Sequence, residues 1–201
     1  MTSTSANIPK LQPPPGPAQD TKLPFLTDVL ELRRRAREHI EQGAVTAAYK
    51  GDRKVIIDLL NQALATELVC VLRYKRHYFM ASGINAEAVA QEFSQHAAEE
   101  QGHADEIAAR ITQLDGEPNF DPEGLAMRSH AEYAPGTNLL DMIKEDLVAE
   151  RVAIQSYTEM IRYIGDDDLT TKRMLERILA VEEEHADDMK TLHETMSGSK
   201  G

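Results

Sequence analysis

Residues 178–189 read Ile-Leu-Ala-Val-Glu-Glu-Glu-His-Ala-Asp-Asp-Met, and the placement of the acids in this stretch decides the fold. Steps of three and four residues keep side chains on one face of an α-helix. By that spacing Glu182 and His185 fall on the apolar face, whereas Glu183 and Glu184 turn towards solvent. The helix is therefore predicted to bury one of three consecutive glutamates, together with a histidine one turn later.

Three other apolar stripes are interrupted by acid in the same way. The residues concerned are Glu67 in the first stripe, Glu100 and His103 in the second, and Glu150 in the third. Glu99 is expected to point outward, because consecutive residues are about 100° apart around a helix. Each of the four stripes therefore carries a carboxylate into the predicted core.

The composition places these stripes in an all-α protein. The 201 residues are 41% hydrophobic but only 5% aromatic, with 11 glycines and no tryptophan, and helix-favouring residues dominate the periodic regions. The single cysteine, Cys70, cannot form an internal disulfide. No secretory leader is apparent, and no uncharged apolar run approaches the roughly 20 residues that cross a bilayer. We therefore expect a cytoplasmic protein that does not span a membrane.

Four segments are expected along the chain. They are a disordered proline-rich arm over residues 1–26, an N-terminal helix extension over 27–49, a four-helix bundle over 50–196 and a flexible tail over 197–201. The short helix of the extension should begin at Thr27 or Asp28 and end at about Gln42. The long helices are predicted at about 52–81, 85–114, 138–165 and 166–196.

The connections between the long helices predict their topology. The first and second helices, and likewise the third and fourth, are joined by short links, so each pair should form an antiparallel hairpin. The middle link, residues 115–137, is long enough to return along the bundle. This length favours the topology with a single long crossover over a simple up-down-up-down bundle.

A run of basic residues in the N-terminal extension allows two interpretations. Its members are Arg33, Arg34, Arg35 and Arg37. They can pair with the nearby acids of a solvated helix, or they can form a basic handle for DNA or a partner. The formal net charge of −12 argues against DNA binding by the rest of the chain, because an acidic body repels phosphates and attracts cations.

Four carboxylates at one level of a bundle core would be strongly destabilising without positive charge between them. No lysine or arginine lies on the central part of the stripes. Two divalent metal ions would balance four carboxylates, and histidine supplies the nitrogen ligands that iron or manganese accepts. Ferritin-like di-iron bundles use one Glu from each of two helices and a Glu-x-x-His pair from each of the others, which is the set found here.

The placement of these residues also indicates an internal duplication. Both Glu-x-x-His pairs continue as Glu-x-x-His-Ala-Asp, and 82 residues separate Glu100 from Glu182. A nearly equal 83 residues separate Glu67 from Glu150. The chain therefore reads as two related helical hairpins, each providing a Glu and then a Glu-x-x-His pair.

Over about residues 50–196 the chain resembles bacterioferritin and its relatives in the ferritin-like superfamily. The stretches that carry the resemblance are residues 59–68 (LLNQALATEL), 100–105 (EQGHAD), 114–119 (LDGEPN) and 182–187 (EEEHAD). The resemblance implies two iron ions in each subunit, with manganese as the alternative metal.

The same resemblance implies a role for each ligand. Glu67 with His103 would hold one iron as terminal ligands, and Glu150 with His185 would hold the other. Glu100 and Glu182 would bridge the two ions. Tyr74, seven residues after Glu67, matches a tyrosine that lies beside the di-iron centre of the family.

Two departures from the family pattern stand out. Gln101 occupies the position of the haem-ligating methionine, which argues against haem between subunits. The chain ends 16 residues after His185, whereas bacterioferritins continue into a short fifth helix that helps to build a 24-subunit shell. A smaller, 12-subunit shell like that of Dps is the alternative.

Two further residues near the predicted ligands have open roles. Cys70 is interpreted as a small buried apolar residue rather than a redox thiol. His96, one turn before Glu100, is either a neighbour of the ligands that helps iron to reach them or a structural histidine with its hydrogen bonds satisfied.

The predicted function is ferroxidase activity and iron storage. The homo-oligomeric shell would oxidise Fe(II) to Fe(III) with O₂ or H₂O₂ and deposit the product as mineral. An enzyme alternative is a di-metal peroxidase or manganese catalase with nearly the same ligands. A binding alternative is DNA protection through the basic extension.

Overall fold

The computed structural model describes residues 28–84 and 86–198, so the predicted arm over residues 1–26 and the last residues of the predicted tail lie outside the described chain. The elements are α1 (Val29–Arg35), the 3₁₀ turn η1 (Ile40–Gln42), α2 (Arg53–Met80), α3 (Ala86–Gln113), α4 (Leu125–Arg128), α5 (Leu139–Ile164) and α6 (Leu169–Ser197). Every regular element of the described chain is helical, which confirms the predicted all-α class. The described residues up to Glu38 form one unit and those from His39 onward form another.

Polar caps define where three long helices begin. The side chains of Asp52, Asn138 and Asp168 accept hydrogen bonds from the backbone N–H groups at the starts of α2, α5 and α6. Because Asp168 is the cap, α6 begins at Leu169, directly after the three aspartates at its predicted start. Gly165, with φ at +52°, ends α5. Glycine suits this position because the left-handed region is unfavourable for residues with a Cβ.

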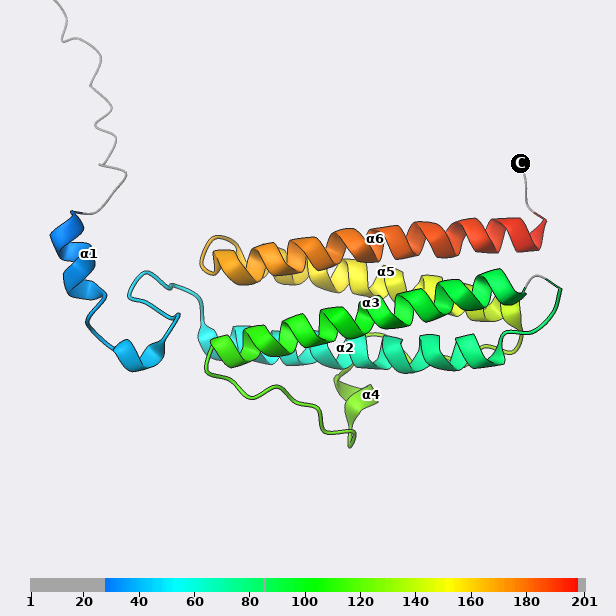
Figure 1. Ribbon diagram of the computed structural model, residues 1–201, viewed down its shortest axis with the longest axis horizontal. Helices are drawn as coiled ribbons and strands as arrows, with labels where there is room; N and C mark the ends of the chain where they lie inside the picture. The colour runs from blue at the N-terminus through cyan, green and yellow to red at the C-terminus, as the bar shows by residue number, and fades with distance from the viewer. Residues whose placement is uncertain (1–27, 85, 199–201) are drawn as a thin grey trace, which may run out of the picture. The chain divides into compact units, whose positions relative to one another are not determined.

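The four long helices form a bundle with one crossover. In Figure 1, α2 and α3 run antiparallel, as do α5 and α6, while α3 and α5 run in the same direction. The segment between α3 and α5 travels back along the bundle and carries the short helix α4, which contacts α2. Asn61 of α2 holds this segment, since its side chain accepts from the Asn119 N–H at 2.8 Å and donates to the Glu117 carbonyl at 3.2 Å.

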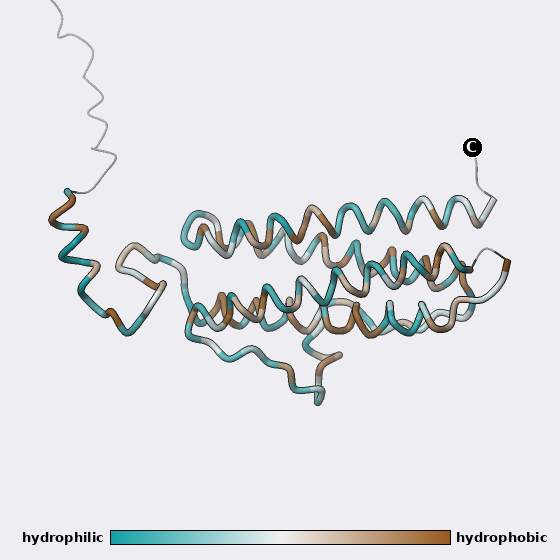
Figure 2. Tube along the Cα trace, in the orientation of Figure 1, coloured by the Kyte–Doolittle hydropathy of each residue, from teal (hydrophilic) through white to brown (hydrophobic). Residues whose placement is uncertain are grey.

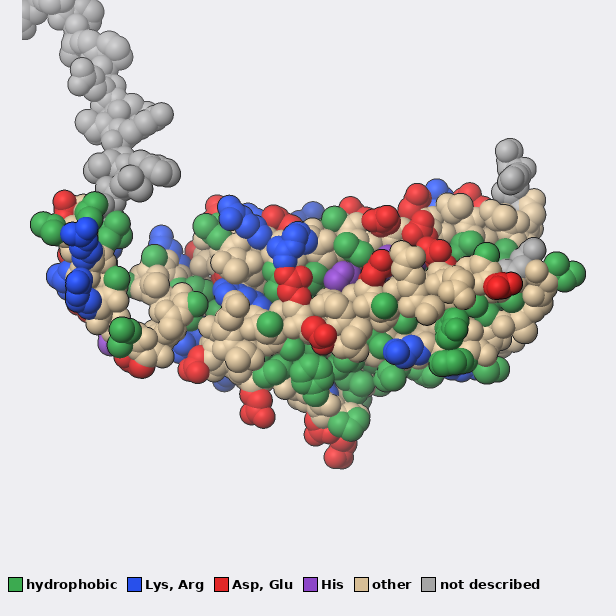
Figure 3. Space-filling model, viewed as in Figure 1, with side chains coloured by type: hydrophobic (Ala, Val, Ile, Leu, Met, Phe, Trp, Pro, Cys, Tyr) green, Lys and Arg blue, Asp and Glu red, His purple; other side chains and the backbone are tan. Residues whose placement is uncertain are grey.

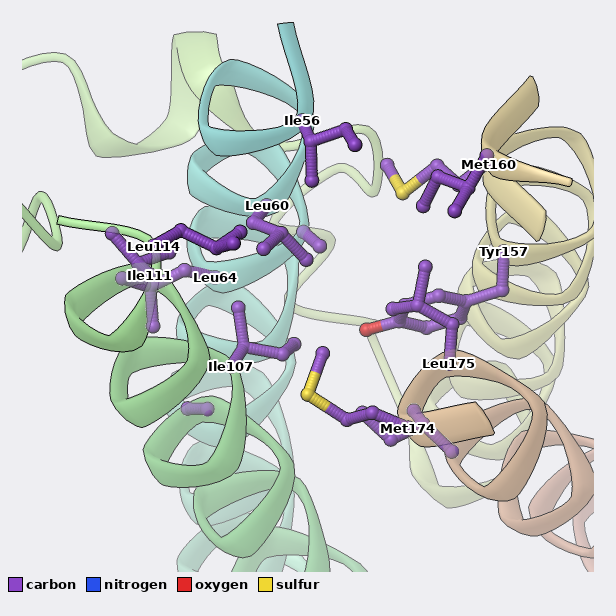
Figure 4. Close-up of a cluster of buried hydrophobic side chains, with 14 of the residues drawn as sticks. Ile56, Leu60, Leu64, Ile107, Ile111, Leu114, Tyr157, Met160, Met174 and Leu175 are labelled. Carbon is purple, nitrogen blue, oxygen red and sulfur yellow. The ribbon is translucent and has the colours of Figure 1, made fainter. Parts of the chain in front are cut away.

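The core of the bundle contains two large apolar clusters, besides a small one around Cys70. One contains side chains from all four long helices, among them Leu60, Ile107, Tyr157 and Leu175 (Figure 4). The other is built around Phe93 and neighbours from the same four helices. Hydrophobic and hydrophilic residues alternate along each long helix (Figure 2), as the helical period requires. The acids that interrupt the stripes lie between the positions that these two clusters occupy along each helix.

The helix of the N-terminal extension is shorter than predicted. It ends at Arg35, and the left-handed backbone of His39, with φ at +52°, precedes the separate turn η1. None of the residues of α1 is buried, and a short helix without packing has little to stabilise it. Arg34 pairs with Glu31 at 2.8 Å and with Glu38 at 2.5 Å, in keeping with the solvated interpretation of the basic run.

One helix is apolar enough to raise the question of a membrane. By length and composition alone α2 could cross a bilayer, although Glu67 interrupts its apolar run. In the bundle, however, 56% of its most apolar window is buried. Helix α2 thus has the burial of a core helix, while charged side chains are scattered over the visible surface of the bundle among hydrophobic and other side chains (Figure 3).

Candidate metal centre

The structure brings together all six residues that the sequence predicted as ligands. Their potential ligand atoms form two groups, each with all its atoms within 4.8 Å of one another. The groups are Glu67, Glu100, His103 and Glu182, and Glu100, Glu150, Glu182 and His185. Glu100 and Glu182 therefore belong to both groups, which is the arrangement expected of carboxylates that bridge two ions.

These side chains are withdrawn from water. The side chain of His103 is 11% exposed, and the side chains of the other five residues are at most 2% exposed. Two of the carboxylates come from α2 and α5, and the Glu-x-x-His pairs come from α3 and α6. Each helix contributes at the same level of the bundle, so the site is held by rigid elements.

Most of the ligand atoms have no hydrogen-bond partner within the protein. In the described residues, nine buried side-chain nitrogen and oxygen atoms lack a partner, and eight of them belong to the six predicted residues. Buried polar atoms are normally paired, because an unpaired one costs about 1–3 kcal/mol. A set of orphaned carboxylate oxygens and imidazole nitrogens that face one another is a donor set suited to iron or manganese.

Burial and mutual repulsion raise the pKa values of three of the carboxyl groups. The pKa values of Glu67 and Glu182 rise well above the usual range, because both groups are buried and lie near the charge of Glu100. The same two causes raise the pKa of Glu150 to about 7. Burial also opposes the ionisation of Glu100, but contacts with Glu67 and both histidines outweigh it and lower the pKa of Glu100. Protons therefore take the place that cations would occupy.

The same excess of carboxylates raises the pKa values of the two histidines. Burial opposes their protonation, yet the surrounding glutamates raise the pKa of His103 to about 12 and that of His185 to about 9. His103 Nδ1 lies 2.9 Å from Glu182 Oε1, and His185 Nδ1 lies 3.5 Å from Glu100 Oε1. Both imidazoles thus direct Nδ1 towards the carboxylates, where a metal ion would compete with the proton.

Glu99 is a residue of the site that the sequence analysis missed. Its Oε2 lies 2.8 Å from His185 Nε2, so the Nε2–H of His185 donates to it and Nδ1 remains available as a ligand. The pKa of Glu99 is lowered because hydrogen bonds from His185 and Gln95 outweigh its partial burial. The outward direction predicted for Glu99 holds only in part, because its side chain is 39% exposed. The periodicity of one helix does not reveal which side chain of another helix a residue contacts, so the contact of Glu99 with His185 could not be predicted.

Two tyrosines form reciprocal hydrogen bonds with the carboxylates that α2 and α5 contribute. Tyr74 of α2 donates a hydrogen bond to Glu150 of α5, and Tyr157 of α5 donates one to Glu67 of α2. Burial raises the pKa of both tyrosines well above the usual range, so they remain donors. Tyr74 was predicted to lie near the centre, whereas Tyr157 was missed. Its signal was present, because Tyr157 follows Glu150 by the same seven residues that separate Tyr74 from Glu67.

The structure places His96 and Cys70 close to the centre. His96 Nδ1 lies 3.2 Å from the Tyr74 hydroxyl, and the His96 ring stacks on His185 with centroids 3.9 Å apart. Burial and the charge of His185 lower the pKa of His96 to about 4. Cys70 is buried, and burial raises the pKa of its thiol, as expected of an apolar neighbour rather than a reactive thiol. Its Sγ lies 3.6 Å from Arg73 Nη2.

The fold and the site together define the class of protein. The profile of the ferritin-like domain matches residues 57–199, which is more than half of the chain. The chain therefore belongs to the ferritin-like family, as the sequence resemblance predicted.

Within this family the chain is similar to bacterioferritins. It is 32% identical to the bacterioferritin of Rhodobacter capsulatus over 146 residues, which cover 71% of this chain and 84% of that protein. A solved structure of a Rhodobacter capsulatus bacterioferritin, described with a metal-free dinuclear site and haem iron, has a TM-score of 0.63 at 30% identity, over 74% of this chain and 88% of that one.

A second solved structure is a dodecameric thioferritin, the bacterioferritin-related protein of Bacteroides fragilis. Its TM-score is 0.71 at 33% identity, and the match covers 74% of this chain and 89% of that one. Position 101, where the sequence resemblance places the haem-ligating methionine of the family, holds Gln101, whose side chain donates a hydrogen bond to Asp105 at 2.9 Å.

Proposed function

We propose that this protein is a ferroxidase that oxidises Fe(II) at a dinuclear centre and stores the Fe(III) product. Glu67 with His103 would bind one ion, and Glu150 with His185 the other. Glu100 and Glu182 would bridge them. The observation that carries this proposal is the sharing of these two carboxylates between two compact four-ligand groups.

The side chains of the centre are suited to taking up cations. The protons held by Glu67 and Glu182 would be displaced as Fe(II) binds, which lets the carboxylates ionise without a net excess of buried charge. Tyr157 and Tyr74 occupy one oxygen of each terminal carboxylate and leave Glu67 Oε2 and Glu150 Oε2 without a partner. Those oxygens are then the ones offered to the ions.

A cavity of about 250 Å³ lies beside this centre and gives substrates a place to approach it. His103 and His185 line it on the side of the ligands, and the exposed Glu184 and half-buried Asp188 line it elsewhere. When bound, a pair of iron ions supplies the electrons that reduce O₂ or H₂O₂. The carboxylates of the protein are hard ligands that also suit the oxidised ions.

We further propose that the chains assemble into a closed homo-oligomeric shell in the cytoplasm. The similarity to the dodecameric thioferritin of Bacteroides fragilis supports twelve subunits, and the similarity to bacterioferritins keeps 24 as the alternative. Electron microscopy of the iron-loaded protein tests storage directly, because a shell with a dense interior is expected.

Stopped-flow absorbance after addition of two Fe(II) per chain tests the oxidation. Glu182→Ala should abolish the rapid phase, because the variant removes a carboxylate shared by both ions. The neighbouring Glu183→Ala is the matched control, since Glu183 is exposed and should leave the rate unchanged. Unchanged oxidation in Glu182→Ala would refute the centre, whereas peroxide turnover with bound manganese and no iron retention would favour the catalase alternative.

A further inference from the structure

A second polar cluster lies outside the six residues of the dinuclear centre. Glu92 and His96 of α3 and Asp188 of α6 place three potential ligand atoms within 4.8 Å of one another. His96 Nε2 lies 3.4 Å from Glu92 Oε1 and 3.6 Å from Asp188 Oδ2. The side chain of His96 is 1% exposed, while those of Glu92 and Asp188 are 33% and 46% exposed. The cluster therefore joins a buried imidazole to two carboxylates that reach solvent.

Hydrogen bonding determines which nitrogen of His96 faces the two carboxylates as an acceptor. The Tyr74 hydroxyl gives its only proton to Glu150, so its oxygen can only accept from His96. His96 must then carry its proton on Nδ1. The other nitrogen, Nε2, then carries a lone pair and forms no hydrogen bond with any described residue, although it lies within 3.6 Å of carboxylate oxygens of Glu92 and Asp188.

A lone pair that faces two carboxylates is unfavourable unless a cation lies between them. We propose that Glu92, His96 and Asp188 bind one divalent transition-metal ion at a third site, separate from the dinuclear centre. One imidazole nitrogen and two carboxylate oxygens form a ligand set suited to Fe(II), Mn(II) or Zn(II), with coordination positions left for water. Magnesium and calcium are less well matched because they prefer oxygen ligands.

An overlapping group, His96 with Glu99 and His185, does not provide this site. The Nε2–H of His185 donates to Glu99 at 2.8 Å, so that nitrogen has no lone pair to offer. Glu99 is likewise engaged as the acceptor. The tautomers therefore select Asp188 and Glu92 as the partners of His96.

The third site adjoins the route to the dinuclear centre. His96 and Asp188 line the cavity of about 250 Å³ that also contacts His103 and His185. The third site would hold an Fe(II) ion between solvent and the centre. This role, unlike the binding itself, rests on the proposed ferroxidase function.

Zinc binding to the full-length assembled protein tests the proposal without relying on activity. Equilibrium dialysis should find three Zn(II) per chain, and anomalous diffraction at the zinc edge should show a peak among Glu92, His96 and Asp188. The double variant Glu92→Gln/Asp188→Asn should bind two. The matched control Glu183→Gln/Asp187→Asn removes two exposed acids of the same helix that do not line the cavity, and it should still bind three.

Two outcomes would overturn the third site. One is the absence of a zinc peak at this place in the wild-type protein, and the other is an unchanged peak in Glu92→Gln/Asp188→Asn. Failure of the ferroxidase proposal is distinguishable, because three zinc ions could bind to a protein that does not oxidise Fe(II). Glu182→Ala, which disrupts the dinuclear centre, should retain the zinc peak at the third site.

Discussion

Helices α2 and α5 contribute buried carboxylates to two clusters, and the negative charge is compensated differently in each. In the proposed dinuclear centre, Glu67 and Glu150 meet other acids, and most of the proposed ligand atoms have no hydrogen-bond partner among residues 28–84 and 86–198. In the second cluster, Arg73 Nε donates to Asp146 Oδ1 at 2.8 Å and His77 Nδ1 lies 2.8 Å from Asp146 Oδ2. Arg73 Nη1 and His77 Nε2 also reach backbone carbonyls of the crossover, at Glu132 and Pro135 respectively.

The contrast shows what a buried carboxylate requires. Asp146 receives positive charge from the chain itself, and all three side chains of its cluster are fully buried. One helical turn away, Glu150 lies among the acids and the histidine of the proposed centre and accepts a hydrogen bond from Tyr74. A carboxylate such as Asp146 is neutralised within the folded chain, whereas one such as Glu150 requires cations from outside the chain.

The largest effect on stability is expected from Asp146→Ala. The variant leaves Arg73 buried without its partner, and breaking a buried ion pair in this way costs about 3–5 kcal/mol. Urea unfolding should show this loss with and without added metal. Glu145→Ala, at the adjacent and more exposed position, is the control and should change the unfolding free energy by less than about 0.5 kcal/mol. A metal-dependent loss in Asp146→Ala would remove the distinction between the clusters.

The free energy of unfolding of the metal-free protein should depend on pH because of Glu150 in the proposed dinuclear centre. The pKa of Glu150 is about 7 in the folded protein, above the ordinary value of 4.5. The folded state therefore holds this proton more tightly, so the stabilisation is complete below pH 4.5 and is lost as the pH rises through 7. At about 1.4 kcal/mol per pKa unit, the loss is about 3 kcal/mol.

Thermal unfolding across this range, in the presence of a chelator, measures the loss. Glu150→Gln removes the titrating group and should flatten the curve relative to the wild-type protein. Bound Zn(II) should do the same, because the ion replaces the proton. Parallel curves for wild-type protein and Glu150→Gln would contradict the expected titration.

A smaller effect is expected from Glu99→Ala, which changes the dinuclear centre without removing a ligand. Loss of the hydrogen bond to His185 Nε2 frees the orientation and tautomer of that ring. Such contacts typically change metal affinity by about 10–100-fold. Titration with Zn(II) should show weaker binding at the dinuclear centre with the free energy of unfolding of the metal-free protein nearly unchanged. Equal affinities in the two proteins would show that Glu99 has no positioning role.

Some of the site could be read from spacing because helical periodicity is local. Glu182 and His185 separate from Glu183 and Glu184 simply by their angle around the helix, and the structure buries the first pair and exposes the second. The duplication could also have predicted that Tyr157 lies beside the site, since Tyr157 repeats the position of Tyr74. The length of α1 was overestimated because spacing alone does not say whether a helix has anything to pack against.

The sequence by itself determined the four long helices, the crossover and the six acids and histidines of the centre. These follow from a 3.6-residue period and from the cost of burying unpaired carboxylates, both of which a single chain displays. Only the tertiary structure decided that Glu99 orients His185, that Arg73 neutralises Asp146 and that Asp188 faces His96. Each of these pairs joins different helices, so its distance depends on how the helices rotate and pack against one another, which no spacing along one helix encodes.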